Sequence, residues 1–260
     1  MTINSVASTQ LNTAMQRIAT GQRINSAADD AAGLAISERM TAQIRGLEQG
    51  TRNVMDMQSL VSTAEGGLSG ITDSLHRIRE LSLQAQNGIL TDDDRQNIQF
   101  EINQLMQEIN DTTQRTEFNS MRLLDGSFNA EDGRGLHVAA DAQGRGPTVH
   151  IGNMSANVLM GPEPYDVTGE FDISRVDEAL TRVTSERAYL GAMYNRFDTT
   201  IASNQITNLN LAAARSRVRD QDIAQAAMHL EQQNVIEQAQ IQAQRIQMEQ
   251  EQLPLASLLT

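Results

Sequence analysis

The 260-residue sequence contains no cysteine, no lysine and no tryptophan, and only 3% of its residues are aromatic. Without cysteine the chain forms no disulfide and offers no thiolate as a nucleophile or metal ligand. Aromatic side chains supply much of the buried area in most globular cores, so their scarcity argues against a thick core. No stretch approaches the roughly 20 apolar residues of a membrane span. The first residues, MTINSVASTQ, also lack the basic and apolar parts of a cleavable signal peptide.

The charge balance is acidic, with a formal net charge of −13 at pH 7. A nucleic-acid reader would carry a basic patch, so we expect no nucleic-acid partner. A composition rich in Ala, Leu, Ile, Gln, Glu and Arg instead favours long helices packed side by side. We therefore expect a cytosolic protein, or one exported by a route that reads no such signal peptide.

Two long segments carry apolar residues at steps of three and four, the 3.5-residue repeat of helices wound around partners. The first runs from Ser37 to about Asn87 and would form a rod about 75 Å long. The second begins at Ser174 and runs to Leu211, with polar interruptions that fix register in coiled coils. These interruptions are Arg187, Asn204 and Asn208.

Shorter segments complete the predicted architecture. Residues 3–20 have helical spacing, and residues 231–252 are Gln- and Glu-rich and need a partner to fold. Thr91 is a predicted N-cap, with three aspartates in the first turn that follows. Residues 134–152 predict a β-hairpin, and its two histidines, at 137 and 150, are better explained as solvent-facing than as a metal pair. The prolines, at positions 147, 162, 164 and 254, leave the helical stretches uninterrupted.

The predicted fold is therefore mainly α. It is a long antiparallel helical bundle or coiled coil, formed by the N- and C-terminal regions, with a small β-hairpin element. No Gly-rich phosphate loop, metalloprotease motif or other catalytic constellation stands out. We predict no enzyme activity, no cofactor and no metal site. Loss of an activity on replacing both hairpin histidines would be the sign of an enzyme.

The stretch RINSAADDAAGLAISERM, residues 23–40, places many small residues where a long helix begins. Small side chains allow backbones to approach closely, and a turn in an isolated domain would not need so many of them. We interpret this connector as a joint against which a neighbouring copy packs. The predicted subunit-packing residues are Arg23, Asn25, Ala28, Asp29, Asp30, Ala31 and Gly33.

The same stretch closely resembles the N-terminal signature of bacterial flagellin. The resemblance continues through TAEGGL, LHRIRELSLQAQNG and RTEFNSMRLLDG, and near the other end through NLNLAAARSRVRDQDIAQ and LPLASLL. It implies a subunit of the extracellular flagellar filament, exported unfolded through the flagellar type III secretion channel. The segment before RIN is shorter than in relatives, and residues 126–172 leave room only for a hairpin and loops. We therefore expect a short form without outer variable domains.

The resemblance also implies domains and partners. Residues 1–36 with 212–260 would form the inner filament core, and residues 37–211 the helical outer shell. The partners would be the chain itself, as a helical homopolymer, with a secretion chaperone, filament cap and junction proteins, and no membrane insertion. The innate Toll-like receptor for flagellin would contact Arg77, Leu81, Gln84 and Glu108. Alternatively, Leu81 is a core position, and Arg77 and Glu108 pair with neighbouring subunits.

Three other functions compete with a filament subunit. A hook–filament junction protein shares the helical plan, but AADDAAGLAISE fits flagellin better. A minor flagellin would need a partner flagellin to assemble. A coiled-coil signalling or adhesin module would explain the heptads but not the connector rich in Ala and Gly.

Overall fold

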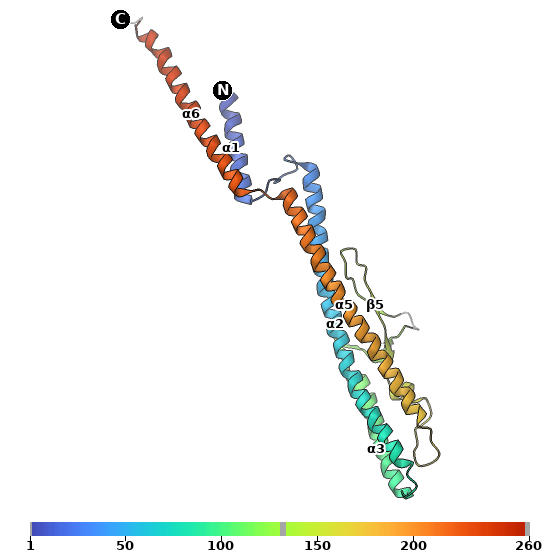
Figure 1. Cartoon of the computed structure of the whole chain (residues 1–260). Coiled ribbons are helices and arrows are strands. Elements are labelled where there is room, and N and C mark those ends of the chain that lie inside the picture. Colours follow the sequence, from blue (N-terminus) through green and yellow to red (C-terminus); the bar gives the residue numbers. More distant parts are fainter. Residues whose placement is uncertain (1, 131–133, 258–260) are drawn as a thin grey trace. The chain divides into compact units, whose positions relative to one another are not determined.

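The computed structural model describes residues 2–130 and 134–257 and is mainly helical (Figure 1). The helices are α1 (Thr2–Thr20), α2 (Ala31–Ala85), α3 (Asp92–Arg115), α4 (Ala156–Met160), α5 (Ser174–Arg219) and α6 (Ile223–Ser257). The strands are β1 (Glu117–Phe118), β2 (Met121–Arg122), β3 (Asp125–Phe128), β4 (Leu136–His137), β5 (Thr148–Val149) and β6 (Ile151–Asn153). The predicted fold class is confirmed. The expectation that all four prolines lie outside the helices is wrong for Pro254, because α6 continues through it.

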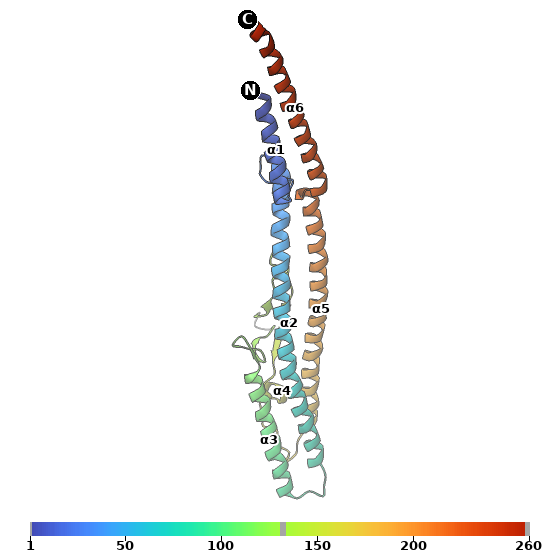
Figure 2. The ribbon, with the colours of Figure 1, turned by 90° about the vertical axis from the view of Figure 1, so that its left-hand side faces the viewer.

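The chain forms two compact units. Unit 1 contains the described residues up to Ile44 and from Leu209 onward, and unit 2 spans Arg45–Asn208. In unit 1, α1 and α6 lie side by side, as both views show (Figures 1 and 2). The division into an inner and an outer filament domain stays a prediction.

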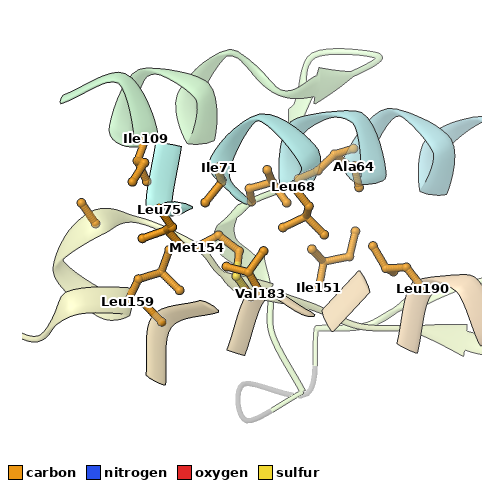
Figure 3. Close-up of a cluster of buried hydrophobic side chains, with 14 of the residues drawn as sticks. Ala64, Leu68, Ile71, Leu75, Ile109, Ile151, Met154, Leu159, Val183 and Leu190 are labelled. Atoms are coloured by element: carbon orange, nitrogen blue, oxygen red, sulfur yellow. The ribbon is translucent and has the colours of Figure 1, made fainter. Parts of the chain in front are cut away.

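The core of unit 2 lies along one face of α2, where the heptad spacing predicted it. Leu68, Ile71 and Leu75 are completely buried and follow each other at steps of three and four. Figure 3 shows these side chains meeting residues from α3, β6, α4 and α5 and from the segment between β6 and α4. The residues that face them are Ile109, Ile151, Met154, Leu159, Val183 and Leu190. Full burial of one such aliphatic side chain contributes roughly 1.5–3 kcal/mol, so this face organises the unit.

The start of α3 has the predicted cap. The Thr91 hydroxyl accepts a hydrogen bond from the Asp94 backbone N–H at 3.2 Å. In return, the Asp94 carboxylate accepts one from the Thr91 backbone N–H at 3.0 Å. This reciprocal pair is a capping box, which satisfies donors that the first helical turn leaves without partners. The Thr91 hydroxyl also donates to the Asp94 carboxylate at 2.7 Å, and this bond, together with the one from the Thr91 N–H, lowers the pKa of Asp94.

A row of polar contacts joins α2 to α5 at every seventh residue of α2. We call this row the polar ladder. Its contacts are Thr51 with Asn204 (3.5 Å), Gln58 with Asp198 (2.6 Å), Glu65 and Thr72 with Arg187 (2.8 and 3.4 Å), and Arg79 with Asp177 (2.6 Å). The charged partners keep a third or more of their side-chain surface exposed, and such pairs add little stability. We infer that the ladder sets the register of the two helices, which is the role predicted for Arg187 and Asn204.

The predicted β-hairpin is confirmed: β4 and β5 pair in antiparallel register. The hairpin packs on α2 at Gly46 and Gly50. A Cβ on Gly50 would lie 2.2 Å from the Ala140 carbonyl oxygen. Two side-chain amides hold the segment that follows β4. Asn53 donates to the Ala139 carbonyl at 2.9 Å, and Asn204 donates to the Ala140 carbonyl at 2.8 Å. Asn204 thus fixes the hairpin as well as the helix register.

Several short elements were not predicted. The β1–β2 hairpin turns through Asn119 and Ser120, both with positive φ, and β3 pairs with β6. The segment after α4 is anchored by Tyr165, whose hydroxyl donates to the Ser82 hydroxyl at 2.9 Å. The Arg175 guanidinium lies over the Tyr165 ring at 5.6 Å. These contacts tie the loop region to α2 and α5.

Glu186 of α5 is expected to make unit 2 less stable as the pH rises. Burial raises the pKa of Glu186, although the Gly152 N–H that its carboxylate accepts at 3.1 Å opposes this shift. A carboxyl with a raised folded-state pKa carries no penalty when neutral and costs stability as the pH rises through that pKa. We expect Glu186→Gln, which keeps an acceptor for Gly152, to be more stable than the unmodified chain at pH 7.

Urea unfolding of both proteins, from below the ordinary pKa of glutamate up to neutral pH, checks this expectation. Below the ordinary pKa of glutamate the two curves should meet, because the carboxyl is then neutral in both the folded and unfolded states. A difference that stays constant across the whole range would mean that the charge on Glu186 is not the cause.

Candidate subunit-packing site

The connector between α1 and α2 lies in unit 1 and is held by its own chain. Gly21, at φ 67°, ends α1, and its carbonyl accepts a hydrogen bond from Gln221 N–H at 2.9 Å. The Arg23 N–H donates to the Arg219 carbonyl at 2.7 Å, and Gln22 forms a β-bridge with Asp220. The connector therefore runs antiparallel to the turn between α5 and α6.

Two arginines strengthen this pairing. The Arg23 guanidinium donates to the Val218 carbonyl at 2.8 Å. The Arg219 guanidinium donates to the Gln22 side chain at 3.0 Å and pairs with Glu38 of α2 at 2.7 Å. Sequence reasoning selected Arg23 but missed Arg219, which lies almost two hundred residues away and carries no local signal.

Asp29 organises the loop itself. One of its carboxylate oxygens accepts the backbone N–H groups of Ser26 at 2.9 Å and Asn25 at 3.1 Å, and the Ser26 hydroxyl at 3.1 Å. The other oxygen pairs with Arg17 of α1 at 3.3 Å. The Ser26 and Asn25 amides lower the pKa of Asp29, because these bonds favour the charged form. Asp29 and Asn25 therefore have a structural role within one chain.

Asp30 and Gly33 begin α2. The Asp30 carboxylate accepts the Gly33 N–H at 2.8 Å, which is the contact of an N-cap residue. A Cβ on Gly33 would lie 2.4 Å from the Asp30 carboxylate and 2.7 Å from the buried Ile24 side chain. The sequence argument that an isolated turn would not need its small residues is therefore wrong for Gly33, because its own chain crowds this position.

The alanines of the connector are different, because their side chains face solvent. Five alanines around the two aspartates are exposed, including the predicted packing residues Ala28 and Ala31. The exposed alanines are Ala27, Ala28, Ala31, Ala32 and Ala35. Together with the exposed Asp29 they surround the start of α2, and we call this set of residues the alanine surface. Of the other predicted packing residues, Arg23 is also exposed, whereas Gly33 is buried.

Of the four residues considered for receptor contact, three are exposed and one is buried. Leu81 is only 2% exposed and belongs to the core of unit 2, as the heptad alternative predicts. Arg77 joins α2 to α3 through Glu101 at 2.8 Å, and these bonds raise its pKa. Gln84 and Glu108 are exposed.

The two histidines of the hairpin have different surroundings. The His137 ring lies 3.0 Å from the Gly144 carbonyl oxygen and is exposed, whereas His150 is half-buried near Gly135. Across residues 2–130 and 134–257, no group of three or more His, Cys, Asp or Glu could hold a metal ion. In the same residues, no helix is long and apolar enough to cross a membrane.

Comparison with protein families decides what this architecture is. The model described as the bacterial flagellin N-terminal helical region matches residues 1–129. The model described as the bacterial flagellin C-terminal helical region matches residues 173–258. The chain belongs to the bacterial flagellin family.

Individual relatives agree with the family match. The flagellin is 39% identical over 229 residues to the flagellar filament 30.7 kDa core protein of Treponema maltophilum, covering 81% of this chain and 79% of that protein. It is 40% identical over 230 residues to the flagellar filament core protein flaB2 of Brachyspira hyodysenteriae, covering 82% and 80%. A flagellin of Halalkalibacterium halodurans is 40% identical over 222 residues, covering 83% and 79%.

Solved structures show the same fold. The crystal structure of Bacillus cereus flagellin matches with a TM-score of 0.52 and 28% identity, covering 62% of this chain and 94% of that chain. A putative flagellar hook-associated protein from Vibrio parahaemolyticus gives a TM-score of 0.59 at 15% identity, covering 74% and 100%. At that identity the second likeness concerns the fold alone. As a flagellin, the chain is a structural subunit of the flagellar filament, not an enzyme, and the predicted family is confirmed.

Proposed function

We propose that this flagellin polymerises outside the cell into a smooth filament, with unit 1 forming its inner core and unit 2 the next shell. The observation that carries this proposal is the apolar surface that unit 1 leaves uncovered. Many large apolar side chains of α1 and α6 are exposed, most by more than half of their surface. They are Met15, Ile223, Met228, Val235, Ile236, Ile241 and Ile246.

A single soluble chain rarely exposes so many apolar residues on one pair of helices, and such surfaces mark interaction sites. Burying one of these side chains contributes roughly 1.5–3 kcal/mol, so repeated contacts between copies supply ample driving force. A contact between two different surfaces, whose rotation does not close a ring, produces an open helical polymer. The filament explains why these helices expose so many apolar side chains.

The alanine surface is proposed as a second contact between copies. Its small side chains let a neighbouring backbone approach closely, while the hydrogen bonds of Asp29 hold the loop in a fixed shape. Because Asp30 and Gly33 are occupied within the chain, they support this surface instead of contacting the neighbour.

Export through the flagellar type III secretion channel, with a chaperone, cap and junction proteins as partners, remains part of the proposal. The sparse apolar contacts of α1 and α6 suit helices that travel unfolded and fold where neighbours arrive. For the innate Toll-like receptor, the exposed Gln84 and Glu108 could contact it directly, with Arg77 contributing through its exposed guanidinium. Leu81 is proposed only as a support beneath them.

Seeded polymerisation of the full chain tests the proposed function. Purified monomer is mixed with sheared filament fragments, followed by sedimentation and examined by electron microscopy. We expect long, smooth filaments. Removal of residues 231–260 should abolish polymerisation, because it deletes much of the exposed apolar surface of α6, while residues 40–215 keep their helical circular dichroism.

Persistent monomer in the presence of seeds would contradict self-assembly and favour a hook–filament junction protein or a minor flagellin. Adding a partner flagellin would then separate these two, since a minor flagellin enters mixed filaments along their length. A truncated chain that still forms filaments would contradict an inner core built with α6.

A further inference from the structure

The turn between α2 and α3 contains Asn87-Gly88, the one Asn-Gly pair in the sequence. Both residues lie outside helical structure and are exposed. We infer that Asn87 is a site of spontaneous deamidation, in which the backbone nitrogen of Gly88 attacks the side-chain amide carbon of Asn87.

The electrophile of this reaction is oriented by the turn. The Asn87 Oδ1 accepts a hydrogen bond from the Ile89 N–H at 3.3 Å, the local contact typical of asparagine in turns. The Asn87 backbone is held at both of its polar groups. Its N–H donates to the Gln84 carbonyl at 3.0 Å, and its carbonyl accepts the Leu90 N–H at 3.2 Å. The hydrogen bond from Ile89 polarises the side-chain amide of Asn87.

The nucleophile is free. Within the described part of the chain, the Gly88 N–H makes no hydrogen bond. Gly88 has no side chain to shield the nitrogen, and nothing lies within 4 Å of where its Cβ would be. The backbone rotation that brings this nitrogen to the amide carbon also costs little free energy, because glycine is conformationally permissive.

Asn153 provides a contrast within the same molecule. Its Oδ1 accepts the Ser155 N–H at 2.9 Å, so its side chain is oriented in the same way as that of Asn87. The next backbone nitrogen, of Met154, however donates to the Leu124 carbonyl at 2.9 Å and is engaged. Asn119 is exposed in a turn but is followed by serine. Asn87 alone among these three combines exposure, a free nitrogen and a following glycine.

The reaction needs only water and hydroxide. Hydroxide removes the proton of the Gly88 N–H, and the nitrogen then forms a bond to Cγ of Asn87. The Cγ–Nδ2 bond breaks, and the leaving nitrogen takes a proton from water, so that ammonia is released and hydroxide is regenerated. Water then opens the cyclic imide at either carbonyl to give aspartate or isoaspartate. The balance is one water consumed and one ammonia released, and the rate rises with pH.

The modified turn is expected to be less stable. A carboxylate would appear at the C-terminal end of a 55-residue helix whose last turn has no basic residue, where the helix dipole disfavours negative charge. The first turn of α3 already carries Asp92, Asp93 and Asp94. Isoaspartate also lengthens the backbone by one methylene and breaks the spacing of the hydrogen bonds around Asn87.

The test is incubation of the full chain at mildly alkaline pH, followed by tryptic digestion and mass spectrometry. Asn87 lies in the peptide 80–95, whereas Asn119 and Asn153 lie in other peptides. We expect Asn87 to convert at least about tenfold faster than either, a difference of about 1.4 kcal/mol in activation free energy. Backbone fragmentation identifies isoaspartate in the product.

Gly88→Ala is the matched variant. Gly88 lacks a left-handed φ and has open space at its Cβ, so alanine fits without strain, and circular dichroism should be unchanged. Conversion of Asn87 should slow by at least about tenfold, which is again about 1.4 kcal/mol. The inference is overturned if Asn87 stays an amide while Asn119 or Asn153 converts, or if the alanine variant reacts equally fast. Neither readout depends on polymerisation.

Discussion

Replacing Gly50 by alanine is expected to detach the β4–β5 hairpin from α2. The new Cβ would overlap backbone atoms of Ala140, which cannot move aside as a flexible side-chain end would. The hairpin must therefore shift, and the hydrogen bonds from Asn53 and Asn204 to its carbonyl groups are stretched or lost. Overpacking of this kind costs about 1–3 kcal/mol. Urea unfolding should show the loss, and hydrogen exchange should show faster exchange across residues 136–149.

Gly66→Ala is the matched control in the same helix. Nothing lies within 4 Å of its Cβ position, so alanine gains helix propensity without a clash and should stabilise the chain by roughly 0.5–1 kcal/mol. The two substitutions are chemically identical and opposite in expected sign. Equal effects would show that helix propensity, and not the approach of the hairpin, determines why Gly50 is glycine.

Replacing Ala28 by leucine is expected to block assembly while leaving the monomer intact. Ala28 is exposed in the connector, and exposed substitutions away from special features change stability by less than about 0.5 kcal/mol. If a neighbouring copy packs on the alanine surface, the larger side chain prevents the close approach. We expect the critical concentration for seeded elongation to rise at least about tenfold, a change of about 1.4 kcal/mol. Sedimentation at several protein concentrations measures it.

Three further variants separate a clash with a neighbouring copy from a change within the monomer. Ala28→Ser adds little volume and should assemble normally. Gly33→Leu should also block assembly, but its monomer should already differ, because the side chain would meet Asp30 and Ile24 of its own chain. Asp30→Ala removes a cap contact to Gly33 worth about 1 kcal/mol. Normal filaments from Ala28→Leu would remove the alanine surface from the proposed contacts.

The helical part of this fold can be predicted from sequence because burial and periodicity coincide over long distances. Leu68, Ile71 and Leu75 repeat at the spacing that a helix needs to bury one face. Thr91 marks the start of α3, because its capping contacts involve Asp94, only three residues further along the chain. β1 and β2 have only two residues each, and the four residues of β3, DGSF, do not alternate between apolar and polar, so these strands could not be recognised.

The other features that sequence reasoning missed are contacts between residues far apart in the chain. Arg219 reaches the connector and Tyr165 reaches Ser82 across intervals that no local pattern encodes. The connector shows the limit most clearly, because Gly33 and Ala28 carry the same signal of small size. Only the structure separates Gly33, which its own chain crowds, from Ala28, which faces solvent. For Leu81 the heptad repeat offered the core position as an alternative to receptor contact, and the structure places Leu81 in the core.

The polar ladder between α2 and α5 gives unit 2 a directional mechanical strength. The two helices are antiparallel, and their contacts are spread from Thr51 to Arg79. A force that drags one helix lengthwise past the other loads all of these contacts at the same moment, since sliding misaligns every partner together. A force that peels the helices apart from one end loads them one after another. A shaft made of such units would resist shear along its length far better than it resists opening at a frayed end.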